Sequence, residues 1–91
     1  MIETPEARLK RMTMRSWRRG TKEMDMILGP WADSRLAGLD AARLELYEAL
    51  LAENDADLLN WVLGKAAPPE ALAGLLGEIA AFSLTRFQPK A

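Results

Sequence analysis

The chain has 91 residues, 49% of them hydrophobic and 27% charged, and a formal net charge of −1. This length fits one small domain over residues 1–91, which we expect to be helical, with about four frayed residues at each end. The absence of cysteine and histidine excludes disulfides, zinc sites and Ser-His-Asp or Cys-His catalysis within the chain. We therefore expect a protein that is not an enzyme, with no catalytic residues and no metal site.

The charge is unevenly distributed along the chain. Residues 1–22 carry seven basic and two acidic side chains, a net of +5, whereas residues 23–91 carry five basic and eleven acidic side chains, a net of −6. A basic N-terminal end of this kind suits nucleic acid, anionic lipid or an acidic protein surface as a partner. There is no signal-peptide pattern and no apolar run of the roughly 20 residues that a membrane span needs, so we expect a soluble intracellular protein without membrane insertion.

A first helix is predicted over residues 5–16. Thr4 is a good N-cap, and Pro5 fits the first helical turn. The apolar side of this helix is thin, so the arginines and lysines between its members are expected to face water. That side consists of Leu9, Met12 and Trp17.

A second helix is predicted to begin after Gly20 and to run to about Leu36. With Gly20 as N-cap, Glu23 falls at the third helical position, where a carboxylate meets unpaired N–H groups and the positive end of the helix dipole. The Gly29-Pro30 pair is expected to kink or divide this helix, because proline removes a backbone hydrogen bond. The apolar stripe has the i, i+3, i+4, i+7 spacing of an amphipathic helix and consists of Met24, Ile27, Leu28 and Trp31.

Three more helices are predicted in the acidic part of the chain. Asp40 should cap a helix from Ala41 to about Glu53, with Glu45 and Glu48 facing out. Asp55 or Asp57 should cap a short fourth helix that Gly64 ends, and a last helix should run from about Glu70 to Arg86 after a proline linker. The expected inner positions of the three helices are Leu44, Tyr47, Leu50 and Leu51; Leu58, Leu59, Val62 and Leu63; and Leu72, Leu75, Leu76, Ile79 and Phe82.

No strand pattern, repeat or low-complexity segment is visible. The fold class is therefore all-α, a compact bundle of five short helices with brief connections. In such a small domain we expect the side chains of Trp31 and Trp61 to pack in the core.

The segment from Arg15 to Asp25 is the most unusual in composition. It combines basic side chains, a tryptophan and a glycine, and then changes to acid. It can be interpreted as a helix–glycine–helix junction with solvated charges. It can also be interpreted as a docking surface, in which a missing Cβ at Gly20 permits close approach and Arg19 offers a planar fork of donors.

Arg18-Arg19-Gly20-Thr21-Lys22-Glu23-Met24-Asp25 resembles the RGxxE signature of the SdhE family, the flavinylation factors of succinate dehydrogenase. Leu50-Leu51, Asp55 and Asp57-Leu58-Leu59-Asn60-Trp61 resemble the second characteristic stretch of that family. The two stretches stand in the family's order, so the resemblance covers residues 8–82.

The resemblance implies a five-helix assembly chaperone of the bacterial cytoplasm or, in a eukaryote, of the mitochondrial matrix. Family members bind the flavoprotein subunit of succinate dehydrogenase, and in bacteria that of fumarate reductase, and promote covalent attachment of FAD to a histidine of that subunit. The cofactor would be held by the partner and not stably by this chain, which we expect to be a monomer when free. The motif positions carried over are Arg19, Gly20 and Glu23, and the neighbouring residues expected at the partner-binding surface are Arg15, Trp17, Arg18, Lys22 and Asp25.

Two other interpretations remain open at this point. The basic segment with Trp17 has the cations and the stacking aromatic ring that a single-stranded nucleic acid needs, so a small nucleic-acid-binding adaptor is the alternative function. The acidic side chains of Glu53, Asp55 and Asp57 could hold a cation, but calcium loops need more oxygen ligands and a glycine turn. Helix capping and a solvated corner explain these acids more simply.

Overall fold

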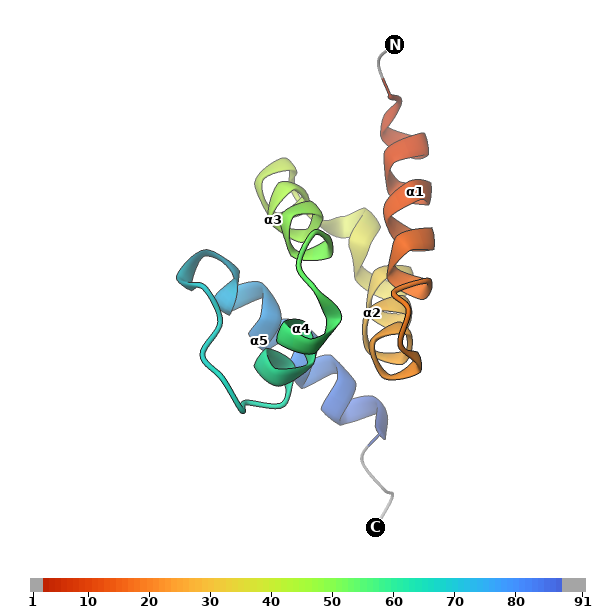
Figure 1. Ribbon diagram of the computed structural model, residues 1–91. Coiled ribbons are helices and arrows are strands. Elements are labelled where there is room, and N and C mark those ends of the chain that lie inside the picture. The colour runs from red at the N-terminus through yellow and green to blue at the C-terminus, as the bar shows by residue number, and fades with distance from the viewer. Residues whose placement is uncertain (1–2, 88–91) are drawn as a thin grey trace.

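The computed structural model describes the backbone of residues 3–87 and the side chains of residues 3–84. This part of the chain contains five α-helices and one 3-10 turn, without strands, as the sequence predicted. The elements are α1 (Pro5–Trp17), α2 (Lys22–Arg35), η1 (Leu36–Gly38), α3 (Ala41–Leu51), α4 (Asp55–Val62) and α5 (Glu70–Phe87). In Figure 1, α1 and α2 form a hairpin on one side, and α3, α4 and α5 pack beside it.

Side-chain caps set where most of these helices begin. Thr4 accepts a hydrogen bond from the backbone N–H of Ala7, and Asp40 accepts one from that of Arg43, as expected for N-caps. The cap of α4 is Asn54, which accepts from the N–H of Asp57. The prediction of Asp55 or Asp57 as that cap was wrong, because the helix begins one residue earlier than the acids suggested. The expected fraying of residues 88–91 lies outside the described residues.

The sequence predicted that the second helix kinks or divides at Gly29-Pro30; it does not divide, so that part of the prediction was wrong. Pro30 lies inside α2, and both residues are buried. Proline removes one hydrogen bond from the helix, but tertiary packing offsets this loss. The residues of α2 on either side, Leu28 and Trp31, are 0% and 2% exposed in the core.

The core lies between the α1–α2 hairpin and the other helices. It is built largely from the predicted apolar stripes, and Trp61 and Phe82 are partly buried against it. The prediction of Leu63 as an inner residue was wrong, because its side chain is 55% exposed at the end of α4. Trp31 and Tyr47 face each other at its centre, with ring centroids 5.0 Å apart. The fully or nearly fully buried hydrophobic residues are Met12, Met24, Leu28, Trp31, Ala32, Leu36, Tyr47, Leu50, Leu51, Leu58, Leu72, Leu75, Leu76 and Ile79.

One polar pair crosses this core. The hydroxyl oxygens of Ser16 and Tyr47 lie 2.5 Å apart, and Ser16 also donates to the carbonyl of Met12. Both side chains are completely buried, so each hydroxyl gives the other a hydrogen-bond partner that water cannot supply. Burial raises the pKa of Tyr47 to about 12.

This shift predicts a loss of stability in alkali. Because the folded pKa lies above the ordinary value of 10.0, the contribution of neutral Tyr47 is complete below pH 10 and is lost as the pH rises through 12. Two pKa units correspond to about 2–3 kcal/mol. Urea unfolding at pH 8 and pH 11.5 should show that the free energy of unfolding falls more for the wild type than for Tyr47→Phe. An equal fall for the two proteins would contradict the prediction.

Candidate functional site

The junction between α1 and α2 carries the segment that the sequence singled out. Helix α1 ends at Trp17, and Gly20 then takes a φ of 104° before Thr21 caps α2 by accepting from the N–H of Met24. The cap was expected at Gly20, so Glu23 lies at the second and not the third helical position. It still lies in the first turn, where the helix dipole favours a carboxylate.

Gly20 is required for its backbone conformation. Side-chain-bearing residues rarely adopt a φ of 104°. A Cβ at this position would meet only Asp55 Oδ2, at an ordinary 3.7 Å. The need for glycine therefore comes from the turn itself, and the expected close approach of a second backbone is not needed to explain it.

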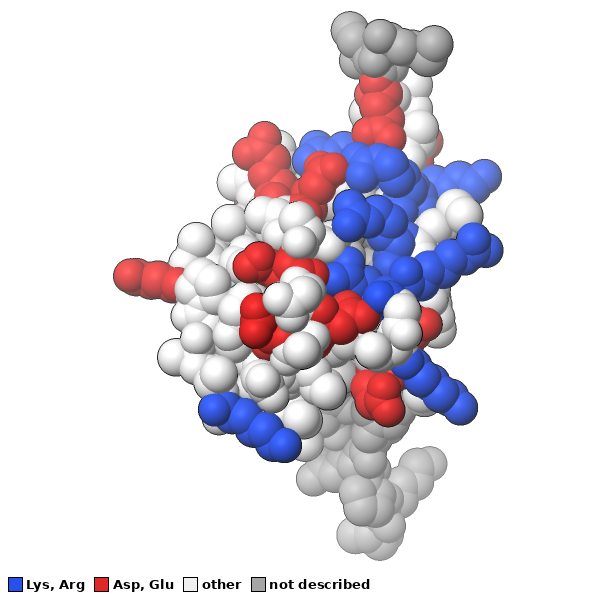
Figure 2. All heavy atoms as spheres, viewed as in Figure 1, with Lys and Arg blue, Asp and Glu red and all other residues white. Residues whose placement is uncertain are grey.

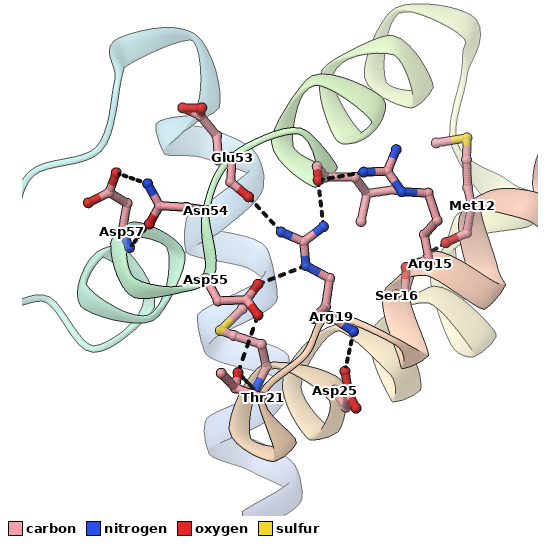
Figure 3. A network of polar contacts seen from close by, with 12 residues as sticks. Met12, Arg15, Ser16, Arg19, Thr21, Asp25, Glu53, Asn54, Asp55 and Asp57 are labelled. Atoms are coloured by element: carbon pink, nitrogen blue, oxygen red, sulfur yellow. Dashed lines mark hydrogen bonds and ion pairs between the residues drawn. The ribbon is translucent and has the colours of Figure 1, made fainter.

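Arg19 points into the molecule (Figure 3). Its guanidinium donates to three acceptors in the α3–α4 connection: the carbonyls of Leu51 and Glu53, each at 2.5 Å, and Asp55 Oδ1 at 2.9 Å. We call these four residues the Arg19 network. The Arg19 side chain is only 8% exposed and that of Asp55 16%, so the ion pair is well shielded from water.

The acceptors of the Arg19 network are those that helix ends leave unpaired. The last carbonyls of α3 have no partner within their helix, and a cation close to them also meets the negative end of the helix dipole. Asp55 begins α4 and lies at the positive end of the next helix. One side chain thus joins the end of α3, the start of α4 and the α1–α2 junction.

The junction backbone is fixed in the same way. The N–H of Arg19 donates to Asp25 Oδ1 at 2.6 Å, and Thr21 Oγ1 lies 3.5 Å from Asp55 Oδ2. Asp25 was expected at the partner-binding surface, but here its carboxylate holds the turn. The acid cluster also has internal partners, because Asp57 accepts from the side chain of Asn54.

Most of the other basic side chains of α1 also bind within the chain. Arg8 and Arg11 both pair with Glu48 of α3, and Arg11 also pairs with Glu3. These cations and Glu48 were expected to face water; they are partly exposed and pair with one another. Hydrogen bonds from Arg11 and Arg8 lower the pKa of the Glu48 carboxyl from its ordinary value.

Arg15 completes this row of cations by donating to the carbonyl of Leu51 at 3.0 Å. Figure 2 shows the resulting band of basic side chains beside acidic ones. Four of the seven cations of residues 1–22 therefore have partners in the chain. This leaves fewer of them for the nucleic acid that the alternative function requires.

Trp17 covers a second glycine. A Cβ at Gly29 would lie 2.3 Å from the Trp17 ring, so the ring lies directly against α2. The indole N–H points to the carboxylate of Asp33, at 3.2 and 3.3 Å. Trp17 is nevertheless 41% exposed, and it presents a fixed aromatic surface. The sequence contained a signal for this contact. Glycine is unfavourable inside a helix, so Gly29 in the predicted second helix indicates that another group packs closely there.

Besides the exposed part of Trp17, three predicted site residues have charged groups available to a partner. Arg18, Lys22 and Glu23 are exposed, and none of their side chains has a hydrogen bond or ion pair with the part of the chain that the structure describes. They surround the junction that the Arg19 network fixes. Within residues 3–84 no group of three or more acidic side chains is arranged to hold a metal ion.

The comparisons with known proteins match this region and most of the chain. A family model described as "Flavinator of succinate dehydrogenase" matches residues 10–83. "Succinate dehydrogenase assembly factor 2, mitochondrial" of Dictyostelium discoideum is 38% identical over 67% of this chain and 43% of its own length. "FAD assembly factor SdhE" of Pseudomonas aeruginosa is 35% identical over 72% of this chain and 77% of its own length.

The protein named "FAD assembly factor SdhE" in Francisella tularensis is 31% identical over 70% of this chain and 67% of its own length. The first mitochondrial relatives are longer, and the match covers 43% and 49% of them. No helix in the described part of this chain is both long and apolar enough to cross a membrane.

Removing the Arg19 side chain should destabilise the fold. Arg19→Ala leaves two carbonyls and the Asp55 carboxylate without their donor, and loss of one partner of a shielded ion pair costs about 3–5 kcal/mol. Arg18→Ala is the matched control, because the adjacent side chain is exposed; it should change stability by less than about 0.5 kcal/mol. Urea unfolding followed by circular dichroism measures both, and equal effects would contradict the role of the Arg19 network.

Gly20→Ala should destabilise the protein through its backbone. The positive φ makes a Cβ cost about 1–3 kcal/mol although there is space for it. Gly74→Ala is the control, since Gly74 lies in α5 with no neighbour within 4 Å of a Cβ, and it should gain up to about 1 kcal/mol of helix propensity. The midpoint of thermal unfolding should fall for Gly20→Ala and rise for Gly74→Ala. A shift of both midpoints in the same direction would refute the conformational argument.

Proposed function

The chain belongs to the family of succinate dehydrogenase flavinators, and on this premise we propose that it is an assembly factor for a flavoprotein subunit. It binds the flavoprotein subunit of succinate dehydrogenase, or that of fumarate reductase, and promotes covalent attachment of FAD to that subunit. The observation that carries the proposal is the family match over residues 10–83. This range includes both the α1–α2 junction and the helices that hold it.

The cofactor belongs to the partner in this proposal. The chain itself has no histidine, so a histidyl bond to the flavin forms on the flavoprotein. The assembly factor is a non-catalytic chaperone without a stably bound cofactor. In this proposal it works as a monomer in the bacterial cytoplasm or the mitochondrial matrix; the name of the Dictyostelium discoideum relative contains the word "mitochondrial".

The site residues divide into two groups in the proposed mechanism. Arg19, Gly20 and Asp25 shape the junction from within, because their groups are used by the turn and the Arg19 network. Lys22, Glu23 and the exposed part of Trp17 make the contact with the partner, and Arg18 supports it. This revises the role of Arg19, which was expected to bind across the interface.

Contact of this kind promotes flavin attachment by selection of a conformation. The surface is held rigidly by the packed helices below it, so it favours one arrangement of the flavoprotein over others. In that arrangement the partner's own histidine is close to the flavin. The gain comes from positioning, which can contribute several kcal/mol to a reaction between two groups held together.

Glu23→Gln should impair binding while the fold is retained. The exposed carboxylate makes charge-assisted hydrogen bonds to the partner that the amide replaces poorly, which weakens binding about 10-fold or more. Binding of the purified flavoprotein subunit is measured by calorimetry, and covalent FAD by in-gel fluorescence.

Glu70→Gln is the matched control, because Glu70 is also an exposed acid in the first turn of a helix, α5. Both variants lose the same charge and the same interaction with a helix dipole. Circular dichroism should show both folded. Equal binding by the two variants would remove Glu23 from the contact, and a wild-type chain that neither binds nor raises covalent FAD would refute the function.

A further inference from the structure

A groove of about 720 Å³ lies at the far end of α2 from the α1–α2 junction. It is bordered by the end of α2, η1, the first turn of α3 and the second half of α5. None of the predicted site residues lines it. The lining residues that matter here are Trp31, Ser34, Arg35, Arg43, Glu78 and Phe82.

The groove is held in shape by the core and by an ion pair between two helices. Trp31 at its base is 2% exposed and packs against Tyr47. Arg43 of α3 forms an ion pair with Glu78 of α5. Such contacts keep the groove open before anything binds, which reduces the entropy that binding must overcome.

Arg35 is the group of the groove that is free to bind. Its guanidinium lies over the Phe82 ring, with the central carbon 5.6 Å from the ring centroid. This contact uses the π face of the ring and fixes the side chain without occupying its N–H donors. No carboxylate in the described part of the chain pairs with Arg35. A guanidinium whose N–H donors have no carboxylate partner is suited to bind a carboxylate through two hydrogen bonds.

The charges of the groove specify the occupant. The groove carries two cations, Arg35 and Arg43, and one acid, Glu78, so it is net positive, and its other lining residues are apolar or small. The chemistry that fits is a carboxylate next to an apolar side chain. This combination occurs in an acidic segment of a protein surface.

We infer that this groove is a second docking site, which takes an acidic segment of the same flavoprotein subunit. The inference rests on the proposed function. Glu23 and Arg35 lie twelve residues apart on one helix, a separation of about 18 Å at 1.5 Å per residue. Two contacts at that separation on one rigid helix fix the orientation of a partner, which a single contact leaves free. That is the property that selection of one flavoprotein arrangement requires.

Charge reversal at Arg35 tests the groove. Arg35→Glu should weaken binding of the purified flavoprotein subunit at least 10-fold, because it places like charges together. Lys65→Glu is the matched control: it makes the same change of net charge at an exposed residue of the α4–α5 connection and should bind as the wild type does. Calorimetry gives the affinities, and circular dichroism shows that both variants are folded.

A crosslinker gives a second readout that does not depend on charge. Ser34, an exposed lining residue, is replaced by p-benzoylphenylalanine in the full chain, and irradiation with the flavoprotein should give a crosslinked product; the same replacement at Lys65 should not. Equal binding by Arg35→Glu and Lys65→Glu overturns the inference. A crosslink from position 34 only to a second copy of this chain also overturns it. If the wild-type chain fails to bind the flavoprotein at all, the proposed function itself fails, which the other outcomes leave intact.

Discussion

The insertion of Arg19 between α3 and α4 is the interaction on which the rest of the site depends. Its guanidinium binds two carbonyls at the end of one helix and a carboxylate at the start of the next. Bare helix ends are costly when shielded from water, because their polar groups lack partners. The side chain that satisfies them comes from the junction between α1 and α2. The position of that junction and the geometry of the α3–α4 connection are therefore set together.

The basic character of the N-terminal segment has a structural explanation. Arg8, Arg11, Arg15 and Arg19 follow one another at helical spacing and meet Glu48, the end of α3 and Asp55. The charge imbalance between the two parts of the chain is thus largely matched within the fold, where basic and acidic side chains form one seam (Figure 2). What remains for a partner is a small set of charges around Glu23, and selectivity then depends on how rigidly they are held.

The sequence predicted the helices well because their apolar spacing is local information. Between Met24 and Trp31, and between Leu72 and Ile79, the helical spacing of the apolar residues is enough to identify the buried face. The pairing of Arg19 with Asp55 could not be derived this way, because the residues are 36 positions apart and only packing brings them together. Gly20 showed that a turn exists, but its positive φ and the exact cap at Thr21 depend on how the helices meet. The predicted division of the second helix at Pro30 failed for the same reason, because tertiary packing can override a local helix-breaking residue.

The residues of the RGxxE signature have two different roles, since Arg19 and Gly20 shape the junction whereas Glu23 is an exposed group on it. This difference determines how variants of the signature must be interpreted. Changes at Arg19 or Gly20 alter the fold around the junction, whereas a change at Glu23 alters an exposed group on an intact surface. On the proposed function, both kinds of change are expected to lower the signal in an assay that reads only covalent flavin attachment. Stability and affinity measured on the same variants separate the two causes, because only the first group should lower the free energy of unfolding. In the proposed function the signature therefore combines a turn that glycine makes easily with an exposed acid in the first turn of α2.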